Sequence, residues 1–205
     1  MGLRERKKEK TRLALLDAAL ELFLEQGYES TTVDQIAGSV DVSPRTFFRY
    51  FASKEHLVFW FHDHGEEVMR AVFDERPADE PPFTLMAHAL RAVLRDMEDS
   101  TPEDSQRFLK MHRLMEENPA LVGKSVARGN ETERRLSAAI ALRMGVDPAK
   151  DQRPQLVVAF AMATMRVGFE CHDGPVTDLS EVVTRMEETL RLAEVSFRPG
   201  WDLAS

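Results

Sequence analysis

The sequence predicts an all-α fold, and three features carry this prediction. Apolar residues recur three or four positions apart along most of the 205-residue chain, which is the spacing of one face of a helix. No run alternates apolar and polar residues over the length of a strand. Proline, glycine and Ser/Thr capping residues divide the chain into segments of helical length.

Two helices are predicted in the first forty or so residues. Apolar positions between Leu13 and Leu24 fall at helical spacing, and Gly27 ends that segment. Thr31 and Thr32 then supply an N-cap for a shorter helix, because a hydroxyl oxygen can accept a free N–H of the first turn.

A tight turn and a third helix follow. Residues 41–42 form the turn, and Ser43 caps a helix that is predicted over residues 44–51. Pro44 occupies the first helical position, where its missing N–H costs nothing.

The rest of the chain is predicted to continue as helices. Ser53 caps a fourth, long helix that runs to about Arg76, and a loop follows at residues 78–82. The later helices are predicted at residues 83–97, 102–116, 119–145, 153–172 and 178–197.

The short third helix has two unlike faces. On a helical wheel, one side gathers the apolar residues Pro44, Phe47, Phe48 and Phe51. The other side gathers Arg45, Thr46, Arg49 and Tyr50. The apolar side can dock on the first two helices, while arginine, threonine and phenol groups suit the bases and phosphates of DNA. A short helix held across another by a tight turn predicts a helix-turn-helix whose second helix enters the major groove.

The charge distribution agrees with a DNA-facing N-terminus. The chain has a net charge of −8, yet its first twelve residues contain six lysines or arginines and two glutamates. A basic start on an acidic body indicates that one end meets a polyanion. We therefore predict a DNA-binding domain over residues 1–54 and a helical domain over residues 55–205.

Two further groups of residues suit phosphates. Thr31 and Thr32 lie at one helix N-terminus, and Ser53 and Lys54 lie at another, where free N–H groups favour an anion. The basic residues within positions 4–8 are interpreted as an arm that follows the DNA backbone or reaches a minor groove, as a disordered, solvated tail, or as both, since such arms often order only on DNA.

Residues 31–57 resemble the tetracycline-repressor (TetR) family of bacterial transcriptional regulators. The matching residues are Thr32, Ile36, Ala37, Val42, Ser43, Thr46, Phe47, Tyr50, Phe51, Ser53, Lys54 and Leu57. Asp41 departs from the family pattern, which has glycine in the turn, although aspartate tolerates the left-handed conformation better than most residues. Phe48 stands where tyrosine is usual, so a phenol contact to phosphate would be missing.

The resemblance implies a sequence-specific regulator, more often a repressor, with a helical effector-binding and dimerisation domain. Together with the helical wheel and the caps, it predicts DNA contacts from Thr31, Thr32, Ser43, Pro44, Arg45, Thr46, Phe48, Arg49, Tyr50 and Lys54. A ligand would move the fourth helix and change the separation of two recognition helices on a palindromic operator.

The C-terminal part predicts a homodimer with an apolar cavity. Residues 155–170 are apolar nearly all round, which indicates one side in the chain's own core and one against a second copy. The predicted interface helices are 153–172 and 178–197. Methionines suit an adaptable cavity for a lipophilic effector, although each alone suits ordinary core filling. The candidate pocket residues are Met86, Phe108, Met111, His112, Met115, Met165 and Phe169.

The sequence argues against several other classes. No catalytic residues or cofactor are predicted, because the sequence has no Gly-rich phosphate loop and no recognisable nucleophile–base motif. No metal site is predicted, because His62 and His64 do not share a helix face and Cys171 and His172 point apart. The longest apolar run, at 156–165, is too short for a membrane span, so the protein is expected in the cytoplasm. Three alternatives stay open: a constitutive regulator without an effector, a helical adaptor that grips an acidic protein, and a small metal-dependent hydrolase.

Overall fold

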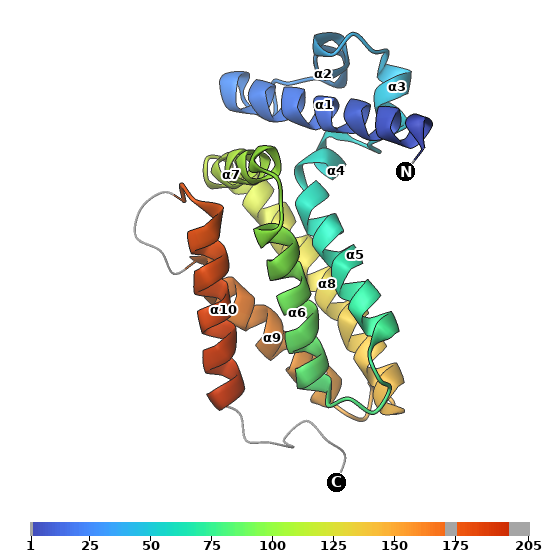
Figure 1. Ribbon diagram of the computed structural model, residues 1–205, viewed down its shortest axis with the longest axis vertical. Helices are drawn as coiled ribbons and strands as arrows, with labels where there is room; N and C mark the ends of the chain where they lie inside the picture. Colours follow the sequence, from blue (N-terminus) through green and yellow to red (C-terminus); the bar gives the residue numbers. More distant parts are fainter. Residues whose placement is uncertain (1, 171–175, 197–205) are drawn as a thin grey trace. The chain divides into compact units, whose positions relative to one another are not determined.

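The computed structural model describes residues 2–170 and 176–196, and every regular element within these ranges is an α-helix (Figure 1). The helices are α1 (Leu3–Gln26), α2 (Val33–Ser39), α3 (Pro44–Phe48), α4 (Lys54–Val58), α5 (Trp60–Glu75), α6 (Pro82–Glu98), α7 (Pro102–Glu116), α8 (Pro119–Met144), α9 (Arg153–Glu170) and α10 (Leu179–Ser196). The all-α prediction is confirmed. Cys171 and His172 lie outside the described residues.

The chain forms two compact units. The first consists of Met1–Asp63 and Gln106–Val122, and the second of His64–Ser105 and Gly123–Ser205. The first unit thus contains the N-terminal helices together with most of α7 and the start of α8. The predicted division into functional domains after residue 54 stays a prediction.

In the first unit α2 and α3 cover one side of α1 (Figure 1), and the core joins residues of these three helices with residues of α4, α7 and α8. The buried core residues are Leu15, Leu16, Ala19, Leu20, Phe23, Tyr28, Ile36, Ala37, Phe47, Phe51, Leu57, Val58, Phe59, Leu114 and Leu121. Leu114 and Leu121 come from α7 and α8, so residues distant in the sequence complete a core that the N-terminal helices leave open.

The turn between α2 and α3 is held by backbone hydrogen bonds and by an unusual conformation at Asp41. The Asp41 N–H donates to the Gly38 carbonyl at 3.2 Å, and the Val42 N–H donates to the Ala37 carbonyl at 3.0 Å. Asp41 has φ +55°, which is the left-handed region expected where the family pattern has glycine. The sequence prediction for this residue is confirmed.

Replacing Asp41 with glycine is expected to stabilise the first unit by about 0.5–1 kcal/mol, because glycine adopts a positive φ without a steric penalty. Denaturant unfolding followed by circular dichroism measures the change. Asp34→Gly is the matched control, since Asp34 lies in the helical backbone of α2 and glycine there costs about 0.5–1 kcal/mol. Destabilisation by both substitutions would show that the turn is not strained.

The predicted long fourth helix is wrong in one respect, because Phe59 interrupts it between α4 and α5. Leu57, Val58 and Phe59 are all buried. Three consecutive residues of a regular helix spread over about 200°. A turn at Phe59 therefore lets all three side chains enter the core.

The basic N-terminus is not a disordered tail, because α1 already begins at Leu3, and its contact with DNA stays a prediction. The Glu5 N–H donates to the Gly2 carbonyl at 3.1 Å, and the Gly2 N–H donates to Glu5 Oε2 at 3.0 Å. Residues 4–8 therefore form the first turns of the helix.

In the second unit, α6, α9 and α10 pack against one another. Gly168 lies where α9 approaches α10 closely, and a Cβ added there would come within 2.9 Å of Met186 Cα. Arg91 of α6 donates from Nε to Glu187 at 2.9 Å and from Nη1 and Nη2 to Glu194 at 2.8 and 2.6 Å. The hydrogen bonds from Arg91 hold the pKa of Glu194 below its usual value.

Across the part of the chain that the structure describes, no helix has the length and apolarity needed to cross a membrane.

Candidate nucleic-acid interface

Helix α3 begins as the sequence predicts. The Thr46 N–H donates to Ser43 Oγ at 3.2 Å, and Pro44 stands at the start of the helix. The helix is shorter than the predicted range 44–51. It ends at Phe48, and the chain continues in a turn. In that turn the Phe51 N–H still donates to the Phe47 carbonyl at 3.0 Å.

The aromatic residues of α3 divide between the core and the surface. Phe47 and Phe51 are buried, with 0% and 1% of their surface exposed. Phe48 is 56% exposed and Pro44 is also exposed, so the predicted apolar side that grouped all four residues is wrong. Phe48 follows Phe47 by one position, about 100° around the helix. Its ring stands edge-on to that of Phe47, with centroids 5.5 Å apart.

The outward surface of α3 carries the arginines. Arg45 and Arg49 are exposed, while Thr46 and Tyr50 are partly buried. The Arg49 guanidinium lies 5.1 Å from the centroid of the Tyr50 ring, and its Nη2 is 3.4 Å from Tyr50 Oη. Together with Phe48, these side chains offer cationic, hydroxyl and aromatic groups suited to base edges and phosphates.

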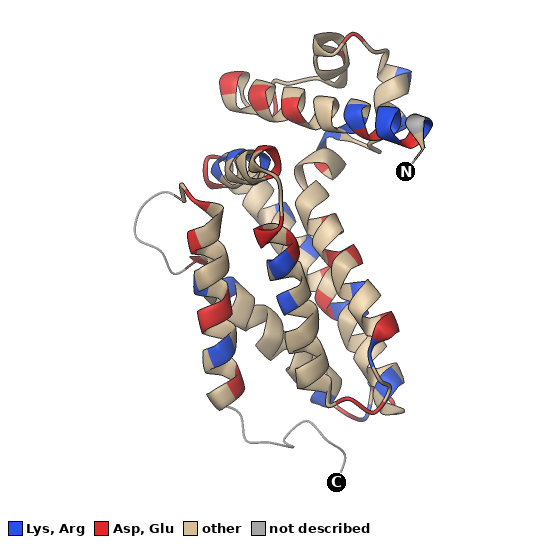
Figure 2. Cartoon of the chain, viewed as in Figure 1, with Lys and Arg blue, Asp and Glu red and all other residues tan. Residues whose placement is uncertain are grey.

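Helix α1 adds a second cationic surface to the same unit. All the lysines and arginines of α1 lie in its N-terminal half, where they outnumber Glu5 and Glu9, whereas the charged residues of its C-terminal half are all aspartate or glutamate (Figure 2). The exposed basic residues of the N-terminal half are Arg4, Arg6, Lys7, Lys8 and Lys10. This half of α1 can therefore approach a polyanion that the other half repels.

Two of the predicted phosphate ligands are engaged within the protein. Thr31 is only 1% exposed, and its hydroxyl donates to the Gly27 carbonyl at 2.8 Å. It also accepts a hydrogen bond from Gln26 Nε2 at 3.1 Å, so a DNA contact from this side chain is not supported. Lys54 reaches the backbone between α1 and α2, with its Nζ 2.7 Å from the Tyr28 carbonyl.

Thr32 and Ser53 are the caps that the sequence predicts. Thr32 Oγ1 accepts the Gln35 N–H at 3.2 Å, and the Thr32 N–H donates to Gln35 Oε1 at 2.8 Å. Ser53 Oγ accepts the His56 N–H at 3.0 Å. Thr32 is exposed and can still face a phosphate.

The predicted effector residues are divided between the two units. Phe108, Met111, His112 and Met115 belong to the first unit, and Met86, Met165 and Phe169 belong to the second. Met111 and Met115 pack against the core of the first unit. The cavity stays a prediction.

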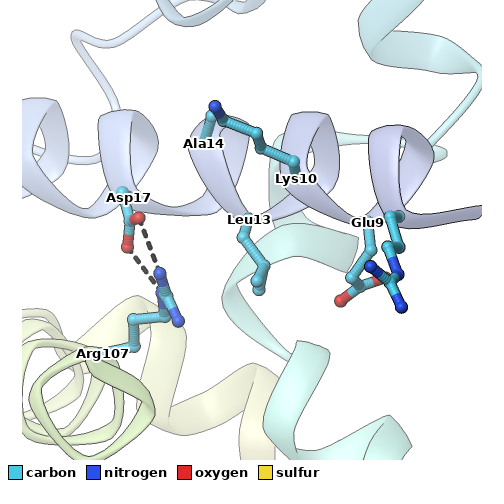
Figure 3. Close-up of a pocket in the computed structure, with 7 residues that line it drawn as sticks. Glu9, Lys10, Leu13, Ala14, Asp17 and Arg107 are labelled. Atoms are coloured by element: carbon cyan, nitrogen blue, oxygen red, sulfur yellow. Dashed lines mark hydrogen bonds and ion pairs between the residues drawn. The ribbon is translucent and has the colours of Figure 1, made fainter. Parts of the chain in front are cut away.

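A groove that the sequence patterns did not predict lies between α1 and α7 in the first unit (Figure 3). It has a volume of about 490 Å³, and charged residues of both signs line it. Arg107 donates from Nε and Nη2 to the two carboxylate oxygens of Asp17 at 2.6 and 2.8 Å. Lys110 pairs with Glu21 on the same two helices. No local pattern identifies partners about ninety positions apart.

Among the described residues, no group of three or more His, Cys, Asp or Glu is placed to hold a metal ion.

Comparisons with known proteins match both parts of the chain. Residues 15–59 match the family model of bacterial regulatory proteins of the tetR family, and residues 84–193 match that of the MftR C-terminal domain. The HTH-type transcriptional regulator TcmR of Streptomyces glaucescens is 44% identical over 192 residues, covering 92% of this chain and 85% of TcmR.

A repressor and a solved structure are also similar. An HTH-type transcriptional repressor of Mycobacterium tuberculosis is 33% identical over 112 residues, covering 53% of this chain and 59% of that protein. The crystal structure of a TetR-family regulator from Streptomyces coelicolor covers 91% of this chain and 96% of its own, with a TM-score of 0.53 and 21% identity. That likeness concerns the fold.

Proposed function

This chain belongs to the TetR family of bacterial transcriptional regulators, and from that premise we propose that it represses transcription as a homodimer on a palindromic operator. As a family member it is a DNA-binding regulator. The observation that carries the proposal is the outward face of α3, where Arg45, Phe48 and Arg49 are exposed above a buried Phe47. The relatives named above are regulators, and we propose no catalytic role.

A homodimer through α9 and α10 is supported by apolar side chains that the single chain leaves in solvent. Leu156, Phe160 and Val167 are exposed on α9, and Leu192 and Val195 are exposed on α10. The three α9 residues are four and seven positions apart, so they share one face of the helix. A second copy would cover this surface and place two recognition helices in successive major grooves.

We also propose that the second unit binds a lipophilic effector that releases the operator. The match to a regulator C-terminal domain over residues 84–193 supports this role, and Met86, Met165 and Phe169 are the candidate contacts there. The effector must bind the DNA-incompetent conformation more tightly, because a ligand with equal affinity for both shifts nothing. A constitutive regulator would lack such a ligand.

Arg45→Ala is expected to cost about 1–3 kcal/mol of operator binding and to relax the preference at one base pair. The operator is first obtained by selection from random duplexes. Fluorescence anisotropy then measures the affinity of the wild type and the variant for the operator and for each single-base substitution.

Arg113→Ala is the matched control, because Arg113 is exposed on α7 of the same unit and pairs with Glu117. It should leave the preference unchanged. A wild-type protein that selects no operator would contradict the proposal and favour the helical adaptor, whereas an operator without two-fold symmetry would contradict the palindromic dimer.

A further inference from the structure

Lys54, the first residue of α4, extends back to the segment that joins α1 to α2. Its Nζ lies 2.7 Å from the Tyr28 carbonyl oxygen and 3.3 Å from the carbonyl oxygens of both Glu29 and Thr31. An ammonium group has three N–H donors and no acceptor. The three carbonyl oxygens therefore match its full capacity to donate.

The groups around the ammonium ion are themselves held in place by the protein. Nζ lies 4.3 Å from the centroid of the Tyr28 ring, within the range of a cation–π interaction. The Tyr28 ring is itself fixed, being 3% exposed and edge-on to Phe23 with centroids 5.1 Å apart. The Glu29 carboxylate lies 3.9 Å from Nζ and adds an attraction at longer range.

A phosphate contact would compete with this arrangement. To reach a phosphate, Nζ would leave three carbonyl oxygens and the ring, and hydrogen bonds from a charged donor are stronger than those between neutral groups. The side chain is 25% exposed, so the carbonyl site holds most of it away from solvent.

Resting on the proposed DNA-binding function, we propose that Lys54 is a positioning residue rather than a phosphate ligand. It fastens α4 to the segment that leads into the helix-turn-helix. The segment Tyr28–Thr31 precedes α2 directly, so this contact sets the angle between α4 and the helices that read DNA. In a dimer that angle governs the separation of the two recognition helices, and hence the half-site spacing that binds best.

The test compares Lys54→Met with the wild type in two DNA-binding measurements and one stability measurement. The slope of log K against log salt concentration is negative, and loss of a phosphate contact reduces its magnitude by about 0.9, or about 1.8 in a dimer. We expect Lys54→Met to keep the wild-type slope, to unfold at a lower temperature, and to lose discrimination between the best operator and one with an extra base pair between its half-sites. A purely structural defect would reduce the active fraction without changing that spacing preference.

Lys10→Met is the matched control, because Lys10 is exposed on the cationic half of α1. It should reduce the magnitude of the salt slope and leave the stability and the spacing preference unchanged. If Lys54→Met instead behaves as Lys10→Met does, Lys54 is a phosphate ligand and the proposal is overturned.

A second measurement uses the wild-type protein and therefore does not depend on the folding of a variant. The Lys54 Nζ resonance, observed by ¹⁵N NMR, should be protected from solvent exchange in the free protein and stay in place when operator is added. A resonance that appears or shifts only with DNA would overturn the proposal. A wild type without sequence preference would refute the regulator function and the positioning role together, while this resonance would still report the carbonyl contact.

Discussion

The Phe47→Ala variant is expected to lose about 3–5 kcal/mol of the free energy of unfolding of the first unit. Its neighbour, Phe48→Ala, is expected to lose less than about 0.5 kcal/mol. Phe47 is fully buried beside Phe51, with ring centroids 5.7 Å apart, so its removal leaves a cavity. Phe48 is 56% exposed, and its removal leaves the core filled.

The two variants should also differ on DNA. Phe47→Ala loosens the packing that holds α3, so the variant should lose operator binding as it unfolds. Phe48→Ala should bind the operator more weakly while its unfolding stays as in the wild type, because its ring lies on the surface beside the arginines. Denaturant unfolding and fluorescence anisotropy measure the stability and the operator affinity of both variants. Equal losses of stability would mean that Phe47 and Phe48 are both buried, as the helical wheel predicts.

Gly168→Ala is expected to destabilise the second unit by about 1–3 kcal/mol, because overpacking forces the neighbouring backbone to shift. The added Cβ would lie 2.9 Å from Met186 Cα and 3.0 Å from Thr189 Oγ1. Helix α10 would have to move away from α9, and the expected dimer surface on these two helices would change with it. Thermal unfolding and sedimentation analysis measure the two effects.

Gly129→Ala is the matched control for this substitution. Gly129 lies within α8, and a Cβ there would meet no atom within 4 Å. Alanine should therefore stabilise this helix by up to about 1 kcal/mol through its higher helix propensity. A similar gain from Gly168→Ala would show that α9 and α10 are not closely packed at that point.

Local features were predicted well because they depend on neighbouring residues. Ser43 and Ser53 cap helices, Pro44 starts α3, and Asp41 takes a positive φ, as the sequence indicates. The predicted boundaries of α6 to α8 lie within about two residues of those observed, which is the usual uncertainty of helix ends.

Long-range features were not predictable from the same patterns. The wheel placed Phe48 in the core because it assigns faces by angle alone, whereas burial depends on what packs against each face. Lys54 was assigned to phosphate from its place at a helix N-terminus, and its carbonyl partners near Tyr28 follow only from the folded chain. The pairing of Arg107 with Asp17 likewise depends on how α7 meets α1.

The discontinuity of the first unit limits how this regulator could be recombined with its relatives. A chimera that exchanged only the contiguous N-terminal piece would separate α1 from Arg107, Leu114 and Leu121, which complete its core and its ion pairs. The transplanted helices would then pack against α7 and α8 residues that differ from their own. An exchange of operator specificity between relatives must therefore carry residues 106–122 along with the helix-turn-helix, or confine itself to the exposed face of α3.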